Sequence, residues 1–399
     1  MADELVRFAD GLALTPHNNR FVQMRKLLHT GLFGIELQKY WHPHEHHSHE
    51  LVKTLVADPT NLVNAIRHHT GPVKLKMTFE YQTLPKEDPF LVLAQTVMSV
   101  FAETSQLGRW LVDIIPALCY IPDWVPGVKF KKSASEWREL HLKMIHGPYE
   151  WAKLNQDSPL LARPNFTSTM LAEYTQMSAE EENILIWSAA SIFGSRFLLL
   201  SLVNAVQSLS IVTGGADTVI YWLTPIFLFS WNAFLQTVSA ISTFYLAMAL
   251  HPHIQIQAHQ ELDNVIGLRL PTLGDRLFLP YVEATMFEVL RWRPVGPLSV
   301  PHLASYNDND MGYFIPKDSI VIANIWHYLY VTYREDMLHD PSIFPEPHKF
   351  IPERFLNSEK AKEAVKTVFG FGRRACPGQS FAELSMLTTY ATALMVSLI

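Results

Sequence analysis

The segment that most constrains this chain runs from Phe369 to Gln379 and reads FGFGRRACPGQ. It places Cys376 in a turn rich in glycine and proline, shortly after two arginines. Glycines allow sharp turns and a close approach of the backbone to a flat ligand, and a proline stiffens the exit. A thiolate is a soft ligand for iron, and nearby positive charge and backbone N–H groups keep it ionised. The segment therefore indicates either a cysteine-ligated metal centre or a buried cysteine beside an ordinary turn.

Length and composition exclude several other classes. A chain of 399 residues is long enough for a large hydrophobic core, and a formal net charge of −6 gives no reason to expect nucleic-acid binding. Two cysteines, Cys119 and Cys376, cannot form a disulfide framework, so we expect a reducing compartment. The first residues, MADELVRFADGLALTP, carry charge and lack a long apolar run, so we expect no signal peptide or anchor there.

The hydrophobic pattern predicts a mainly α fold with a small β region. Apolar residues recur at helical spacing in four segments, which are 20–33, 134–154, 178–193 and 281–292. Ser178 followed by Glu180 and Glu181 is typical of a helix start, and Pro294 is expected to end the last helix. Alternating isoleucine and valine in 311–326 predict short strands. No repeat or linker is visible, so one domain over 1–399 is the simplest organisation.

The cysteine segment resembles one specific family motif. Phe369, Gly372, Arg374, Cys376 and Gly378 stand at the spacing F-x-x-G-x-R-x-C-x-G, which is similar to the haem-binding loop of the cytochrome P-450 monooxygenases. The resemblance implies the cytochrome P-450 fold and haem b as cofactor. It implies that Cys376 is the thiolate ligand of the iron, that Phe369 packs near it and that Arg374 pairs with a haem propionate.

A second motif lies upstream of the cysteine segment. Glu288 and Arg291 are three residues apart in EVLR, so they share one face of a helix, and Arg354 follows in PERF. By itself the spacing fits a surface ion pair of under about 1 kcal/mol. The order of the two motifs resembles the structural triad of the family, which implies that these three residues are buried together and support the cysteine loop.

Two further positions match haem contacts of the family. His302, in PLSVPHLA, occupies a position that often contacts a propionate. Arg25 matches the arginine of the W-x-x-x-R helix, where Phe21 replaces the tryptophan. Phenylalanine can pack but cannot donate a hydrogen bond, so the tryptophan's bond to a propionate is not expected here.

The stretch TGGADT, residues 213–218, resembles the oxygen-activation motif of the family's long central helix. The resemblance implies that Thr218 hydrogen-bonds the oxygen and that Asp217 helps to deliver protons, a general-acid role. A glycine-rich loop without function is the alternative interpretation of these residues.

The resemblance covers the chain from Arg20 to about Met395. The amino-acid sequence is most similar to that of the fungal members of the family. It implies a monooxygenase of fungal secondary metabolism that inserts one atom of O2 into an apolar organic substrate. It also implies electrons from an NADPH-dependent flavoprotein reductase, membrane association, and a place on the cytosolic face of the endoplasmic reticulum.

The chain also departs from the family pattern. The family's anchor, first strands and first helices would precede Arg25, and its last hairpin would follow the C-terminal helix, so we expect both ends to be incomplete. Surplus segments are expected at about 195–212, 219–236 and 328–336. The stretch 219–236 approaches the length of about 17–25 residues that crosses a bilayer. We interpret the first two as translated introns, and keep membrane-inserted helices, or a non-catalytic remnant from a mis-spliced gene, as alternatives.

The histidine-rich stretch 39–52 offers a weaker alternative function. His42, Glu45 and His46 stand at the H-x-x-E-H spacing of some zinc hydrolases, although chance matches are easy in such a stretch. We interpret it as a solvated helix face and keep a zinc hydrolase as the alternative. Asn165 opens an N-F-T glycosylation sequon, but the cytosolic location implied by the resemblance argues against its modification.

Overall fold

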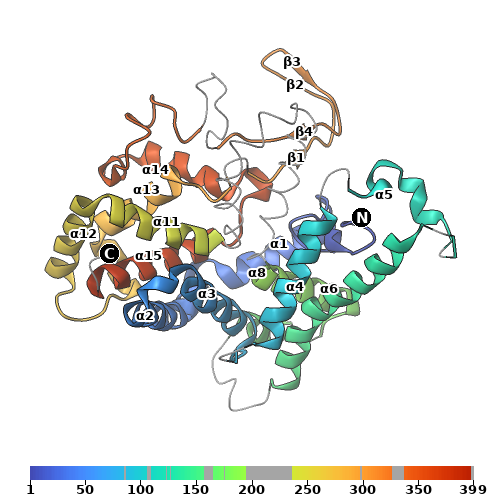
Figure 1. Cartoon of the computed structure of the whole chain (residues 1–399), viewed down its shortest axis with the longest axis horizontal. Helices are drawn as coiled ribbons and strands as arrows, with labels where there is room; N and C mark the ends of the chain where they lie inside the picture. The colour runs from blue at the N-terminus through green and yellow to red at the C-terminus, as the bar shows by residue number, and fades with distance from the viewer. Residues whose placement is uncertain are drawn as a thin grey trace. The chain divides into compact units, whose positions relative to one another are not determined.

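We describe a computed structural model of the chain (Figure 1). It describes residues 1–84, 87–105, 109–122, 124–125, 127–156, 165–174, 176–194, 236–296, 299–325 and 337–396. The α-helices are α1 (Asn19–Leu32), α2 (Trp41–Ala57), α3 (Leu62–Phe79), α4 (Pro89–Thr104), α5 (Leu111–Ile114), α6 (Lys129–Leu154), α7 (Phe166–Glu173), α8 (Ala179–Gly194), α11 (Gln236–Leu250), α12 (Pro252–Val265), α13 (Pro280–Trp292), α14 (Glu359–Val365) and α15 (Gln379–Val396).

The four predicted helices are confirmed as α1, α6, α8 and α13. Asn18 caps α1 by accepting a hydrogen bond from the Phe21 amide at 3.0 Å. Ser178 and Glu181 form a reciprocal capping box at the start of α8, with the Ser178 amide donating to Glu181 Oε2 at 2.9 Å and the Glu181 amide donating to Ser178 Oγ at 3.3 Å. Helix α13 ends just before Pro294, as the missing N–H of proline requires.

The predicted strand region, 311–326, contains the strands β3 (Tyr313–Ile315) and β4 (Ile320–Val321), and each pairs with a strand that precedes the region. Strand β1 (His302–Leu303) pairs with β4, and β2 (Asp308–Asp310) pairs with β3, both antiparallel. Figure 1 shows the β2–β3 hairpin extending beyond the β1–β4 pair. The mainly α fold with a small β region is therefore confirmed.

The chain groups into two compact units. The first contains Met1–Glu50 and Asn64–Leu235, and the second contains Leu51–Val63 and Gln236–Ile399. The single domain over 1–399 stays a prediction.

In the first unit, α8 packs against α1, α6 and α7. Trp187 of α8 is almost fully buried, and its ring meets the ring of His141 in α6 edge to face, with centroids 5.5 Å apart. Helices α1 and α7 touch at Gly31, where an added Cβ would lie 2.4 Å from the Phe166 ring. Glycine at this position therefore sets how closely the two helices approach.

In the second unit, α13 is the central helix and packs against α11, α12, α14 and α15. Nearly every residue of α13 from Tyr281 to Arg291 is buried. Helix α15 is held to α11 by Tyr390, whose ring stacks on Phe244 at 4.0 Å and whose hydroxyl donates to the Ala240 carbonyl at 2.9 Å. Helices α13 and α15 therefore support the cysteine segment.

The sequon at Asn165 has a structural role. Asn165 is almost fully buried and caps α7, accepting from the Ser168 amide at 2.9 Å while its own amide donates to Ser168 Oγ at 3.1 Å. Thr167 of the same sequon is fully buried. The folded chain therefore does not present this sequon for glycosylation.

Within the described ranges, none of the helices is both long enough and apolar enough to cross a membrane. The predicted surplus segments at 195–212, 219–236 and 328–336 lie outside the described residues, apart from Gln236 at the start of α11.

Candidate functional site

Cys376 lies in a compact turn between two short 3-10 helices and α15. The first 3-10 helix, η8 (Lys366–Phe369), ends at Gly370, and the second, η9 (Gly372–Arg374), leads to the cysteine. The Cys376 amide closes the turn by donating to the Phe369 carbonyl at 2.7 Å. Gly370 has φ +86° and ψ −171°, and Gly372 has φ +51°. The first of these conformations is essentially restricted to glycine, so the turn depends on it.

The surface of this turn is half-exposed although much of it is apolar. From Lys366 to Ala382 no residue is buried, whereas α15 becomes buried from Glu383 onward. Phe369, Phe371 and Cys376 all have intermediate exposure, and so does Arg374. A half-exposed apolar surface around a thiol, with a guanidinium in the same turn, can receive a flat apolar ligand that carries acidic groups.

Glu288 and Arg291 form a completely buried ion pair in α13. Arg291 Nε donates to Glu288 Oε2 at 2.7 Å and Nη2 donates to Oε1 at 2.8 Å, and both side chains have 0% exposure. Burial raises the pKa of Glu288, and the hydrogen bonds from Arg291 oppose that shift. The carboxylate also accepts from the Ile351 amide at 2.8 Å. Burial of two charges is tolerated only with such complete pairing.

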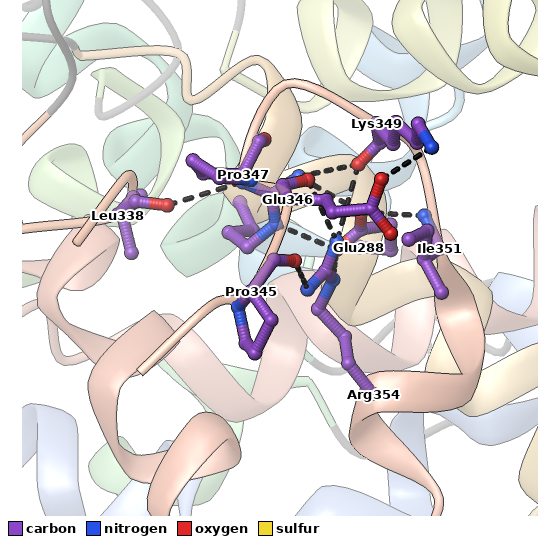
Figure 2. Close-up of polar contacts among 9 residues, drawn as sticks. Glu288, Leu338, Pro345, Glu346, Pro347, Lys349, Ile351 and Arg354 are labelled. Atoms are coloured by element: carbon purple, nitrogen blue, oxygen red, sulfur yellow. Dashed lines mark hydrogen bonds and ion pairs between the residues drawn. The ribbon is translucent and has the colours of Figure 1, made fainter. Parts of the chain in front are cut away.

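The rest of the Arg291 guanidinium is used by backbone carbonyls from a distant segment. Nη1 donates to the carbonyls of Leu338 at 3.1 Å and Pro347 at 2.8 Å, and Nη2 donates to that of Lys349 at 3.1 Å. Figure 2 shows these carbonyl groups gathered around the buried Glu288. All five N–H groups of Arg291 therefore have partners, and the pair fixes the segment 338–351 on α13.

Arg354 completes the group predicted as a triad. Its Nε lies 3.4 Å from Glu288 Oε2, an ion-pair contact rather than a well-formed hydrogen bond. Its terminal nitrogens donate to the carbonyls of Pro345 at 2.7 Å, and of Glu346 and Lys349 at 3.3 Å (Figure 2). The structure thus brings Glu288, Arg291 and Arg354 together in a buried cluster.

Packing connects this cluster to the cysteine turn. The PERF segment forms the 3-10 helix η7 (Pro352–Phe355), which packs against α13 and α14. Helix α14 packs in turn against η8, the helix that leads into the cysteine turn. On the other side of Cys376, α15 packs directly against α13. Both flanks of the turn therefore rest on the helix that carries Glu288 and Arg291.

The other predicted haem contacts lie on separate elements. His302 lies in β1 with intermediate exposure, paired with Val321 of β4. Arg25 lies in α1 of the first unit with intermediate exposure, while Phe21 is buried, consistent with a packing role. The roles of His302 and Arg25 as haem contacts stay predictions. Asp217 and Thr218 lie outside the described residues.

The zinc alternative finds no support. His42, Glu45 and His46 lie in α2, with the two imidazole centroids 6.4 Å apart. Among the residues that the structure describes, no group of three or more His, Cys, Asp or Glu side chains could hold a metal ion. The prediction of a solvated face holds for His42 and His46, which are exposed, and is wrong for His44, which is buried and whose pKa burial lowers to about 3.

Two polar groups around α13 and α15 were not predicted from the sequence. The Glu261 carboxylate of α12 accepts from the amides of Tyr281 and Val282 at 2.8–3.0 Å and so caps α13. Arg276, in the 3-10 helix η6 (Leu273–Phe278), joins Glu283 of α13 to Glu383 of α15. Arg276 and Glu383 are 107 residues apart, so no local spacing could have indicated the pair.

Comparison with known proteins identifies the family. The family model described as Cytochrome P450 matches residues 226–395. The chain is 34% identical over 400 residues to Cytochrome P450 monooxygenase 45 of Postia placenta, with 99% of this chain and 67% of that protein covered. It is 36% identical over 402 residues to Cytochrome P450 monooxygenase 208 of the same fungus, with 99% and 69% covered. The chain thus spans about two thirds of the length of these relatives.

Solved structures support the same fold. A zebra fish cytochrome P450 solved with progesterone superposes with a TM-score of 0.69 at 23% identity, covering 99% of this chain and 79% of that one. A structure of a zebra fish cytochrome P450 with abiraterone gives a TM-score of 0.68 at 20% identity. At this identity the likeness shows the fold alone.

This chain belongs to the cytochrome P450 family. Membership makes it an oxidoreductase of the monooxygenase class with haem as cofactor. The described residues fit that cofactor, because the turn around Cys376 combines a glycine-dependent backbone, a half-exposed apolar surface and Arg374.

Proposed function

We propose that this chain inserts one oxygen atom from O2 into an apolar organic substrate, with Cys376 as the thiolate ligand of the haem iron. The observation that carries the proposal is the cysteine turn: Gly370 and Gly372 adopt positive φ, and the turn closes through the Cys376 amide. When bound, haem would supply the dioxygen chemistry, and a thiolate ligand such as that of Cys376 would favour cleavage of the O–O bond.

Several residues would hold the cofactor, each in a different way. Cys376 would present its thiolate at the N-terminal end of α15, where the first N–H groups of an 18-residue helix favour negative charge. Arg374, Arg25 and His302 would neutralise the propionates. Phe369 would pack against the cofactor near the thiolate. Glu288, Arg291 and Arg354 would keep the turn in place without touching the cofactor.

Proton supply would fall to Asp217 and Thr218. The Thr218 hydroxyl can both donate and accept a hydrogen bond, so it can orient the oxygen that is to be cleaved. The Asp217 carboxyl can move protons toward it from solvent, a general-acid role. Both assignments rest on the resemblance of TGGADT to the family motif.

The partners and the location are proposed from the family resemblance. An NADPH-dependent flavoprotein reductase would supply two electrons per turnover, and the second oxygen atom would leave as water. The relatives named above are fungal, which favours a place in fungal secondary metabolism. A place on the cytosolic face of the endoplasmic reticulum membrane is proposed from the family resemblance alone. Haem cofactor sites are mostly apolar, which favours an apolar substrate.

Isotopically labelled dioxygen tests the proposal directly. The full chain, loaded with haem and supplied with NADPH and a fungal reductase, would be incubated with a set of apolar substrates. We expect products that carry one labelled oxygen atom in the full chain and none in Cys376→Ser. Labelled product at an equal rate in Cys376→Ser would overturn the assignment of the thiolate.

A further inference from the structure

The first turn of α15 sits directly behind Cys376. The helix begins at Gln379, and the Ala382 amide donates to the Gly378 carbonyl at 2.9 Å. The Cys376 sulfur lies 3.8 Å from the position that a Cβ would take on Gly378. A shift in this helical turn would therefore move the sulfur.

Glu383 places a carboxylate one turn into the same helix. It is the first buried residue of α15, with a side-chain exposure of 12%. It accepts from Gln379 Nε2 at 2.9 Å and from Arg276 Nη2 at 3.2 Å. With a helical rise of about 1.5 Å per residue, Glu383 lies only about 6 Å along the axis from the start of α15. Its charge is close enough to act on a group at that end.

Arg276 is the cation between the two helices. Its Nε donates to Glu283 Oε1 at 2.8 Å, and Glu283 lies in the first turn of α13. The Arg276 side chain is 28% exposed, so its charge is only partly screened by water. One guanidinium thus faces two carboxylates, and the group carries a net negative charge.

We infer that Arg276, Glu383 and Gln379 are positioning residues that fix the first turn of α15 and set the negative charge behind the Cys376 thiolate. The inference rests on the proposed function, in which that thiolate ligates the iron. Removal of Arg276 would leave Glu383 uncompensated, and added negative charge favours the oxidised iron. Removal of the Glu383 charge would favour the reduced iron. Charge near an iron centre is one of the means by which a protein sets its potential.

The direction in which the reduction potential changes distinguishes this role from simple packing. If the group only held two helices together, Arg276→Gln and Glu383→Gln would both lower stability and would not move the reduction potential in opposite directions. If it sets the charge at the thiolate, Arg276→Gln lowers the potential and Glu383→Gln raises it. Glu383→Gln keeps the shape of the side chain and one of its two acceptor oxygens, so loss of the charge is its main effect.

The experiment measures the reduction potential of the haem-loaded full chain and of three variants. We expect the reduction potential to fall by about 28 mV in Arg276→Gln and to rise by about 28 mV in Glu383→Gln. This shift corresponds to about a threefold change in the one-electron reduction equilibrium, because about 59 mV corresponds to a tenfold change. Arg276→Lys keeps the charge and should restore most of the parent value. If Arg276→Gln fails to load haem, the rise in the reduction potential of Glu383→Gln tests the inference by itself. No shift, or shifts of the same sign, would overturn the inference.

A matched control is Arg269, whose partner Asp275 precedes Arg276 in the chain. Arg269 pairs with Asp275 at 2.5–2.7 Å in the same region but makes no described bond to α15, so Arg269→Gln should leave the potential unchanged.

Hydrogen exchange of peptides covering 376–384 gives a readout that needs no haem. Exchange should quicken in Arg276→Gln and not in Arg269→Gln, and equal protection in both would count against the inference. The spectrum of Cys376→Ser is measured in parallel. If it loses the thiolate-type signature, the proposed function is supported even when this inference fails.

Discussion

Arg291 binds both oxygens of Glu288, at 2.7 and 2.8 Å, with no exposure of either side chain. The remaining guanidinium donors bind carbonyls of the segment that precedes the cysteine turn. An i,i+3 pair on a helix surface is worth a few tenths of a kcal/mol, but the same spacing here organises a buried junction. Arg291 thus binds the segment 338–351 to α13 at three carbonyls, and Glu288 and Arg354 add further bonds to the same segment.

Arg291→Ala should prevent stable folding of the second unit and, with it, haem loading. The substitution removes the bidentate partner of the buried Glu288 carboxylate and leaves the carbonyls of Leu338 and Pro347 without their donor. Breaking such a buried pair costs about 3–5 kcal/mol. Haem content and the free energy of unfolding by denaturant check this. Arg293→Ala, at the exposed neighbouring arginine, should change both little. A fully loaded, equally stable Arg291→Ala would mean that the buried junction is not required.

Gly370→Ala should destabilise the cysteine turn by about 1–3 kcal/mol. Gly370 has φ +86° and ψ −171°, a conformation that a Cβ strongly disfavours. The comparison is Gly378→Ala in the same turn, where an added Cβ would make an ordinary contact of 3.8 Å with the Cys376 sulfur. Denaturant unfolding and haem retention report the difference, and equal values for the two variants would show that the backbone of Gly370 is not strained by alanine.

Buried histidines should make the first unit sensitive to acid. His141 packs against Phe8 and Trp187, and burial lowers its pKa from 6.5 to about 4. Because the unfolded chain binds a proton more readily than the folded one, stability is full above pH 6.5 and falls as the pH drops toward 4. The shift corresponds to roughly 3 kcal/mol, at about 1.36 kcal/mol per pKa unit.

Unfolding free energies measured between pH 7 and pH 4 test this dependence. His141→Phe keeps an aromatic ring in the site but cannot be protonated, so it should flatten part of the slope. His44 and His47, whose pKa values burial lowers to about 3 and about 4, contribute a residual slope of the same sign. An unchanged slope in His141→Phe would contradict the assignment.

Removal of 195–212 together with 219–236 should increase haem loading. In the family motif Thr218 continues directly into the helix that here becomes α11, and the predicted surplus segment ends where α11 begins, at Gln236. An apolar insert at that point would displace the downstream helix along its axis or expose its aromatic residues. Haem per protein is the measurement, with removal of 195–212 alone as the comparison. Equal loading in all versions would show that both segments are part of the functional protein.

The sequence predicted what depends on local spacing and missed what depends on tertiary contacts. The cysteine turn, the helices and the Glu288–Arg291 pair could be predicted, because glycine conformations, helical periodicity and i,i+3 spacing are local properties. The partners of Arg291 could not, since Leu338 and Lys349 lie 47 and 58 residues along the chain. The Arg276–Glu383 pair and the burial of His44 escaped prediction for the same reason: packing of distant elements decides them.

The reduced carbon-monoxide difference spectrum tests the central claim most directly. It distinguishes haem with a thiolate ligand from haem with any other ligand, and the chain offers its own control in Cys119, which lies in the 3-10 helix Pro116–Tyr120. We predict a thiolate-type spectrum for the full chain and for Cys119→Ser, and its loss in Cys376→Ser. A thiolate-type spectrum that persists in Cys376→Ser would contradict the account.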